Sequence, residues 1–236
     1  MVSIDTVYQR VLAIANKEQR GYITPQEFNL LANQAQMAIF EQYFYDINQF
    51  GRDWHGNDTE YSDMLDLLNK KLAPFQSSGN VTGGATALPA SVYRLGTVMY
   101  NPSTFDYAVE VEEVKENELL YMNSSTKTRP SAKRPVYTRT GTSTIQIHPT
   151  TIVDDVTCTF VINPSQQGVS AKWGYAVVNE KALYNANETT NFLLHASEES
   201  NLVIKILELA GVILNKPGLV QIAQQEEVQM ISQQKQ

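Results

Sequence analysis

Apolar residues recur at helical spacing near both ends of the sequence, and they alternate with polar residues in the long region between. The helical spacing covers residues 3–18, 25–50, 59–72 and 197–214, and it predicts a helix over each range. Helices first, strands next and helices again is an order typical of an α+β fold. We expect a bundle formed by the N- and C-terminal helices, into which an antiparallel β-rich region is inserted.

The same pattern divides the chain into four parts. Residues 1–75 are expected to be an N-terminal helical part, and residues 76–195 a β-rich region. Residues 196–218 carry the C-terminal helix that packs with the N-terminal helices, and residues 219–236 are an extended Gln-rich tail. Residues 76–87 are rich in Ser, Gly, Thr and Ala, and this composition predicts a linker into the β-rich region.

The helix that begins near residue 25 has the clearest start signal. Thr24 is the expected N-cap, Pro25 the first helical residue, and Glu27 the acid that closes a capping box. Ile23 and Phe28 stand at the positions of a hydrophobic staple. We expect this helix to run to about residue 50.

This helix is apolar on two sides. One stripe consists of Phe28, Leu31, Ala35, Ile39, Tyr43 and Ile47. The other stripe consists of Leu30, Met37, Phe40 and Phe44. A helix with two apolar sides is covered from two sides. Phe40 and Phe44 are therefore candidate residues of an oligomer or partner interface, although a larger bundle within one chain explains them equally well.

The region between the helical ends is rich in Thr, Val and Tyr and has the period of half-buried strands. Strands are expected over residues 87–100, 109–114, 135–139, 144–149, 156–162, 173–178, 181–184 and 191–194, with a short helix over residues 115–122. The connections at residues 140–143 and 179–180 have turn composition, and each predicts a hairpin.

The C-terminal helix is expected to begin at Ser197, which is a good cap and is followed by two acids that suit the positive end of a helix. It is apolar over most of its circumference, so it is a core or interface element. Pro217 and Gly218 end it. The tail that follows contains many Gln and five recurring apolar residues, which are Leu219, Ile222, Val228, Met230 and Ile231. We interpret them as a docking segment for a partner, and plain disorder is the alternative.

Composition and charge exclude some functions. The 236-residue chain is 42% hydrophobic and 18% charged, with a net charge of −7, and this is a folded composition. A nucleic-acid-binding protein carries a basic face. The densest basic stretch, residues 127–139, includes two prolines and is interpreted as a solvated loop that enters a strand. We therefore expect no sequence-specific nucleic-acid binding.

Residues able to act as nucleophiles, bases or metal ligands are scattered. Cys158 lies within a strand pattern without a base nearby in the sequence, and it is interpreted as a buried structural residue. Residues 53–55 (Asp-Trp-His) are interpreted as a helix connection and residues 154–155 (Asp-Asp) as a turn, while His148 and His195 are surface or capping residues. We expect no catalytic residue, no cofactor and no metal, and hence a protein that is not an enzyme.

Targeting signals are not evident in this sequence. The longest apolar run, residues 202–214, is interrupted by Lys205 and Glu208 and is too short to span a bilayer. The N-terminus lacks the basic start and apolar core of a signal peptide. A single cysteine allows no disulfide within the chain, which fits a reducing compartment. We expect no membrane partner.

An ordered set of short motifs resembles one protein family. The set is Leu88-Pro89-x-x-x-Tyr93-Arg94-Leu95, Val111-Glu112-Glu113-Val114-x-x-x-Glu118-Leu119, Arg134-Pro135-Val136-Tyr137, Ile145-Gln146-Ile147-His148-Pro149, Ile162-Asn163-Pro164, Trp173-Gly174-Tyr175 and Ser197-Glu198-Glu199 through Leu209-Ala210-Gly211. In this order the chain resembles the head–tail connector (adaptor or ring) proteins of short-tailed bacteriophages, closest to those of crAss-like and related marine phages. Residues 166–172 match no pattern of that family.

The resemblance implies a structural virion protein at the head–tail junction, made in the cytoplasm of the bacterial host. Such proteins form a ring, expected to be a dodecamer, beneath the portal protein and above a downstream tail or ring protein. DNA passes through the lumen, and a negatively charged chain suits this because anionic walls do not trap a polyanion. The alternatives are a tail-associated module that binds a receptor or glycan and, less favoured, a tail-associated hydrolase.

Overall fold

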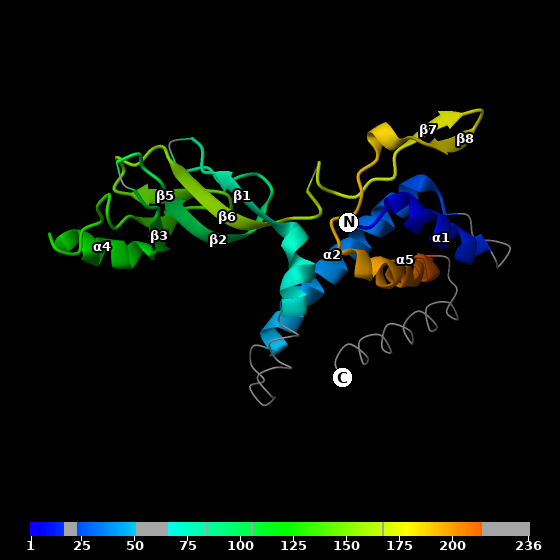
Figure 1. Cartoon of the computed structure of the whole chain (residues 1–236), viewed down its shortest axis with the longest axis horizontal. Helices are drawn as coiled ribbons and strands as arrows, with labels where there is room; N and C mark the ends of the chain where they lie inside the picture. Colours follow the sequence, from blue (N-terminus) through cyan, green and yellow to red (C-terminus); the bar gives the residue numbers. More distant parts are fainter. Residues whose placement is uncertain (17–22, 51–65, 84, 105, 167, 214–236) are drawn as a thin grey trace. The chain divides into compact units, whose positions relative to one another are not determined.

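The computed structural model describes residues 1–16, 23–50, 66–83, 85–104, 106–166 and 168–213. It confirms an α+β fold, with a six-stranded mixed sheet and a separate two-stranded sheet (Figure 1). The described residues form two units. The first contains those of Met1–Pro74 and Pro164–Gln236, and the second is Phe75–Asn163. The expected β-rich region, residues 76–195, therefore contributes to both units.

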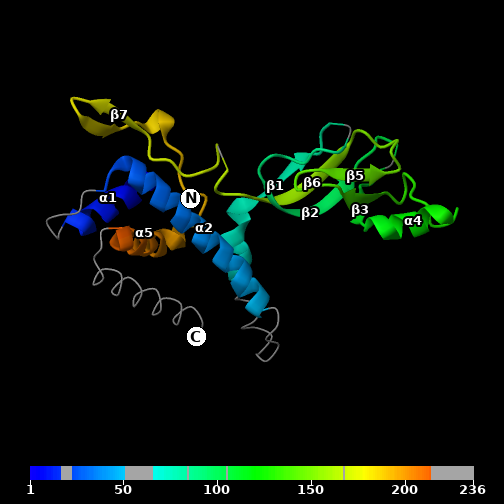
Figure 2. The ribbon, with the colours of Figure 1, turned by 180° about the vertical axis from the view of Figure 1, so that it is seen from behind.

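Helices from both ends of the chain build the first unit. They are α1 (Ile4–Asn16), α2 (Pro25–Phe50) and α5 (Glu199–Ile213). Both α1 and α2 contact α5, and Figures 1 and 2 show the three helices side by side. Residues 66–72 are also helical, and the 3-10 helix η1 (Ala73–Phe75) follows them. These helices confirm the predictions for residues 3–18 and 25–50; of the helix predicted over 59–72, the first residues lie outside the described ranges.

Large apolar side chains without exposed surface form the core of this unit. Among the largest are Ile4, Phe28, Phe40, Phe192, Leu194, Leu202 and Ile206. Full burial of a side chain of this size contributes roughly 1.5–3 kcal/mol. Helix α5 is covered on all sides, because every residue from 201 to 211 is buried or half-buried. This explains why its sequence is apolar over most of its circumference.

The expected capping box is present at the start of α2. The backbone N–H of Thr24 donates to the Glu27 carboxylate at 2.9 Å, and the N–H of Glu27 donates to Thr24 Oγ1 at 3.3 Å. The backbone N–H of Thr24 and its hydroxyl, which also donates to the Glu27 carboxylate at 2.8 Å, hold the pKa of Glu27 below its ordinary value. Ile23 and Phe28 are both buried, as a hydrophobic staple requires.

The second apolar stripe of α2 is not continuous, and this prediction was wrong at Leu30. Leu30 is 74% exposed, whereas Phe40 is completely buried. At 3.6 residues per turn, the ten residues between them leave their side chains about 80° apart around the helix. Leu30 therefore lies on a different face from Phe40.

The second unit contains the larger sheet. Its strands are β1 (Gln76–Asn80), β2 (Val92–Tyr100), β3 (Val109–Glu113), β4 (Val136–Arg139), β5 (Ile145–His148) and β6 (Val156–Ile162), in the spatial order β1-β6-β2-β3-β4-β5. Neighbouring strands are antiparallel except β3 and β4, which are parallel. The expectation of a purely antiparallel region was wrong, because helix α4 (Glu116–Ser124) and the residues after it return the chain before β4 begins.

The segment of residues 81–88 helps to close this sheet around its core. The N–H of Val81 donates to the carbonyl of Val156 in β6, and the N–H of Ile145 in β5 donates to the carbonyl of Thr86, both at 2.9 Å. The enclosed core consists of Val81, Ala85, Val98, Val111, Tyr137, Ile145, Ile147, Ile152, Val156, Cys158 and Phe160.

Other boundaries also differ from the sequence predictions. Residues 76–80, expected to be linker, form strand β1, because β6 pairs with all five of them and tertiary pairing overrides their low strand propensity. Strand β2 begins at Val92 rather than residue 87, since residues 86–88 bond to residues 143–145 instead. Residues 191–194 form only an isolated bridge between Phe192 and Val2.

The start of the C-terminal helix was assigned to the wrong residue. The cap is His195, whose Nδ1 accepts from the N–H of Ser197 at 3.3 Å, and a 3-10 turn, η3 (Ala196–Glu198), precedes α5. The capping role of His195 is therefore confirmed, while Ser197 lies inside the turn. This arrangement directs Glu198 into the core, where it is 2% exposed.

Candidate interaction surface

A projecting hairpin in the first unit carries four exposed apolar side chains. It consists of β7 (Tyr175–Val178) and β8 (Lys181–Tyr184), as the sequence predicted, and we call it the arm. Its exposed apolar side chains are Val177 (67%), Leu183 (52%), Val178 (50%) and Tyr184 (46%). In Figures 1 and 2 the arm extends beyond α1, α2 and α5.

Both faces of the arm carry apolar side chains. Directly paired residues share a face, so Val177 lies with Ala182 on one face, while Ala176 lies with Leu183 on the other. A two-stranded sheet is only marginally stable in water by itself. An arm with apolar side chains on both faces is therefore suited to insertion against another protein surface.

The turn of the arm has the geometry of a tight hairpin. Asn179 and Glu180 have φ values of 50° and 63°. Positive φ at both central residues is the mark of a type I′ turn, which matches the twist of the flanking strands. Asn tolerates this conformation well, whereas Glu does so with strain. The turn therefore places an acidic side chain at the tip of the arm.

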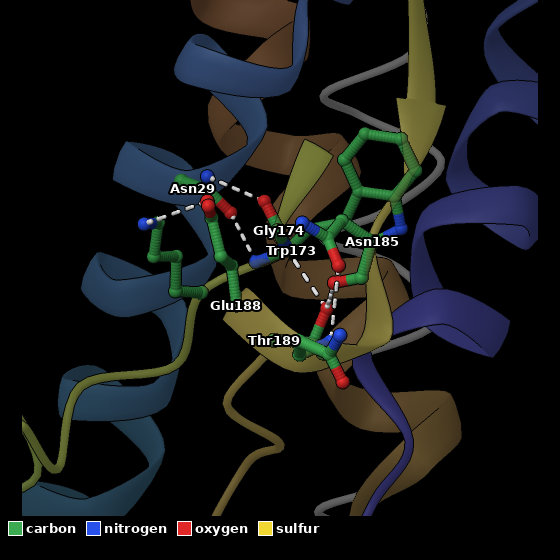
Figure 3. A network of polar contacts seen from close by, with 8 residues as sticks. Asn29, Trp173, Gly174, Asn185, Glu188 and Thr189 are labelled. Atoms are coloured by element: carbon green, nitrogen blue, oxygen red, sulfur yellow. Dashed lines mark hydrogen bonds and ion pairs between the residues drawn. The ribbon is translucent and has the colours of Figure 1, made fainter. Parts of the chain in front are cut away.

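The root of the arm is held by a hydrogen-bond network (Figure 3). The N–H of Gly174 donates to Thr189 Oγ1 at 3.1 Å, and the N–H of Asn185 donates to the carbonyl of Gly174 at 2.9 Å. Thr189 Oγ1 in turn donates to the carbonyl of Asn185 at 2.7 Å. A Cβ at position 174 would lie 2.6 Å from the backbone carbon of Glu188, so only glycine fits here.

An aromatic column connects the root to the core. Phe28 and Tyr8 have ring centroids 4.6 Å apart, and Tyr8 and Trp173 have centroids 4.5 Å apart. Trp173 then contacts Tyr175 and Tyr184, with centroids at 6.0 and 5.7 Å. Each contact of this kind adds about 0.5–1.5 kcal/mol beyond area burial. The base of the arm is thus packed, while its outer half is exposed.

Asn29 of α2 anchors the residue at the start of the arm. Its Oδ1 accepts from the N–H of Trp173 at 2.7 Å, and its Nδ2 donates to the carbonyl of Trp173 at 3.2 Å (Figure 3). The indole N–H of Trp173 donates to the Asp5 carboxylate at 2.9 Å. Two helices therefore fix both the backbone and the ring of this residue.

Asn33 and Gln36, further along α2, continue this role. Asn33 donates to the carbonyl of Ala171 at 2.8 Å. Gln36, which is fully buried, donates to the carbonyl of Pro164 at 3.3 Å and accepts from the N–H of Leu193 at 3.2 Å. We call Asn29, Asn33 and Gln36 the amide ladder. It supplies hydrogen bonds to irregular backbone that would otherwise be buried unpaired.

A buried ion pair stabilises the helices elsewhere in the first unit. Lys71 Nζ lies 2.7 Å from Glu198 Oε1, with side chains 9% and 3% exposed. Asn201 also donates to Glu198 at 3.1 Å, and the Lys71 ammonium lies 6.0 Å from the centroid of the Tyr43 ring. Burial and the Glu198 carboxylate raise the pKa of Tyr43. Because cation and anion are paired and enclosed, we assign the cluster to folding.

The interface candidates from the sequence differ in how deeply they are buried, and some of them lie outside the described residues. Phe40 is completely buried inside the chain, and its ring meets that of Phe44 edge to face at 5.1 Å. Phe44 is half-buried, and an interface role for it stays a prediction. The tail residues Leu219, Ile222, Val228, Met230 and Ile231 lie outside the described residues, as do residues 53–55.

The chemical candidates that fall within the described residues are not brought together. Cys158 is buried in the sheet core, and burial raises the pKa of its thiol. His148 ends β5, and partial burial lowers its pKa. Within the described ranges, no three His, Cys, Asp or Glu side chains are grouped to hold a metal ion. Of the helices that the structure describes, none is long and apolar enough to span a bilayer.

Helix α4 presents a second exposed apolar surface, in the other unit. None of its residues is buried, and Leu120 and Tyr121 are largely exposed. A nine-residue helix is marginal by itself in water. At its start the backbone N–H of Lys115 donates to the Glu118 carboxylate at 3.1 Å. Its exposed apolar side chains therefore mark a candidate contact surface for a partner.

Sequence reasoning predicted the arm but missed its anchoring. The signal was present, because Asn29, Asn33 and Gln36 recur at helical spacing between apolar residues of α2. No protein-family model matches this sequence, and comparison with curated proteins gave no match.

Proposed function

We propose that this chain is a structural protein whose copies assemble into a ring, and that the arm forms part of the contact between copies. The observation that carries this proposal is the exposure of Val177, Val178 and Leu183 on a firmly anchored hairpin. A flexible loop would lose conformational entropy on binding, whereas an anchored arm has lost it already.

We further propose that the ring is the connector between the portal and the tail of a short-tailed bacteriophage, with DNA passing through its lumen. The ordered sequence motifs support this role, as does the net charge of −7. In this proposal the helices of the first unit form a bundle that faces the portal. The second unit, with the exposed apolar residues of α4, faces the downstream tail or ring protein. Twelve copies are expected from the resemblance.

Native mass spectrometry and negative-stain microscopy of the 236-residue chain test the proposal. The wild type should form a closed ring of defined copy number. Val177→Asp combined with Leu183→Asp should reduce it to monomers with unchanged circular dichroism, because burial of unpaired charges in the contact is costly. Val153→Asp is the matched control, since Val153 is 48% exposed on a loop of the other unit.

The outcomes separate the two parts of the proposal. A wild-type chain that stays monomeric at every accessible concentration contradicts self-assembly. If the double variant still forms rings, the proposed self-assembly stands, but the arm is not part of the contact between copies. For the connector role, microscopy of phage particles should place the ring between portal and tail. A location elsewhere in the particle contradicts that role.

A further inference from the structure

Strand β1 is an end strand of the larger sheet, and its outer edge is open. Its inner edge pairs with β6 along all five residues. Within the described parts of the chain, no backbone hydrogen bond joins the outer edge to another segment. Edge strands are commonly guarded by charged residues or proline. The sequence of β1, Gln-Ser-Ser-Gly-Asn, contains neither, so the edge is free to accept a further strand.

An open groove of about 550 Å³ crosses the sheet next to this edge. Its lining includes Gln76, Ser78, Arg94, Gly96, Thr159 and Val161. The hollow has a local cause, because β2 bulges between Leu95 and Val98 and leaves Gly96 without a side chain over the sheet. Added strands obtain affinity from the backbone edge and specificity from neighbouring pockets. Edge and groove together have the form of a strand-acceptor site.

The arm carries a strand whose length and lack of charge match those of β1. Strand β7, Tyr-Ala-Val-Val, has four residues and no charge, against five uncharged residues in β1. Strand β8 begins with Lys181, and an edge lysine opposes pairing. Among the described residues, no backbone hydrogen bond joins the outer edge of β7 to another segment. The outer edge of β7 is therefore better suited than that of β8 to pair with β1 of another copy.

We propose that the outer edge of β7 in one copy pairs with the open edge of β1 in a second copy. This inference rests on the proposed self-assembly and specifies its contact. Donor and acceptor are different surfaces of the same chain, so each copy gives one strand and receives one. Such a head-to-tail contact closes into a ring when the rotation per copy fits, and otherwise forms a filament.

The charges of Glu180 and Arg94 favour an antiparallel register between β7 of one copy and β1 of the other. With Val177 opposite Ser78, the centres of both strands align, and the tip of the arm lies beside Gln76. In the sheet, Gln76 belongs to a row that continues through β6 to Arg94. Arg94 is exposed and is the one charged residue among those lining the groove. The acidic tip residue Glu180 then approaches this cation, whereas a parallel register directs it to the uncharged far end of β1.

Disulfide trapping between two differently tagged versions of the chain tests the contact. Ser78→Cys in one version and Val177→Cys in the other should give a dimer of mixed mass under mild oxidation, because paired strands bring Cα atoms within disulfide range. Gln76→Cys with Asn179→Cys is a second pair from the same register. Leu30→Cys replaces the arm cysteine in the control, since Leu30 is equally exposed on α2. The control should give only a trace of mixed dimer.

Each result has one interpretation when the oligomeric mass is measured in parallel. Mixed dimers from both designed pairs, absent from the control, support the inference. An oligomeric chain that yields no mixed dimer from either pair overturns this contact and leaves the proposed ring intact. A monomeric chain overturns both. Arg94→Glu should weaken association, and Glu180→Lys added to it should restore association; equal weakening by the double variant contradicts the antiparallel register.

Discussion

Replacement of Gln36 by Met tests whether the amide ladder holds the backbone that carries the arm. Gln36 has no exposed surface, and its side chain bonds to the carbonyl of Pro164 and the N–H of Leu193. Methionine has similar length and keeps the helix propensity, but it can make neither bond. The substitution therefore leaves one buried acceptor and one buried donor without partners.

The expected cost follows from those two groups. Each buried polar group left unpaired costs about 1–3 kcal/mol. The two bonds are long, at 3.3 and 3.2 Å, which places each in the lower half of that range. We expect the free energy of unfolding of the first unit to fall by about 2–4 kcal/mol. Urea titration followed by helical circular dichroism measures it, and amide exchange at Leu193 should accelerate.

Gln34→Met is the matched control, because Gln34 is exposed on the same helix. It should change the free energy of unfolding by less than about 0.5 kcal/mol, as surface substitutions usually do. If the two variants were equally stable, and the amide of Leu193 exchanged at the wild-type rate in both, the ladder would contribute nothing and this account of the arm's support would be refuted.

Three further perturbations follow from the structure. Lys71→Ala should destabilise the first unit by roughly 3–5 kcal/mol, because it leaves Glu198 buried without its cation. Lys70→Ala breaks a solvent-exposed ion pair with Asp66 and should cost under about 0.5 kcal/mol, and urea titration measures both variants. Gly174→Ala should destabilise by about 1–3 kcal/mol and speed amide exchange in the arm, because its Cβ meets backbone; unchanged exchange contradicts this. Because the pKa of Glu27 is lowered in the folded state, its ionised carboxylate stabilises the fold above pH 4.5, and this contribution is lost as the pH falls through the folded-state pKa. A pH titration of the free energy of unfolding should show this loss in the wild type but not in Glu27→Gln.

Local signals predicted most of the elements. The capping box placed the start of α2 because Thr24 and Glu27 act through neighbouring backbone alone. Alternation placed β3 and β6, and turn composition placed the arm around Asn179 and Glu180. In each case the deciding interactions lie within a few residues along the chain, where sequence patterns carry the information.

The main failures depend on distant residues. Strand β1 exists because β6 pairs with it, and the sequence of Gln76–Asn80 has no pattern that predicts this pairing. The parallel β3–β4 pair is set by the path of the chain through α4. The amide ladder was missed because Asn29 and Gln36 bond to segments more than a hundred residues away. The proposed interface between copies is a property of several chains, and one sequence can suggest only the surfaces that would form it.

Amide hydrogen exchange of residues 175–184 as a function of protein concentration tests the central claim most directly. The arm is exposed in the single chain, so its outer amides should exchange rapidly in dilute protein. If copies associate through the arm, these amides should become protected as concentration rises, while the amides of α4 keep their rate. An arm that exchanges at the same fast rate at every concentration, in a sample shown by mass to be oligomeric, would contradict the account.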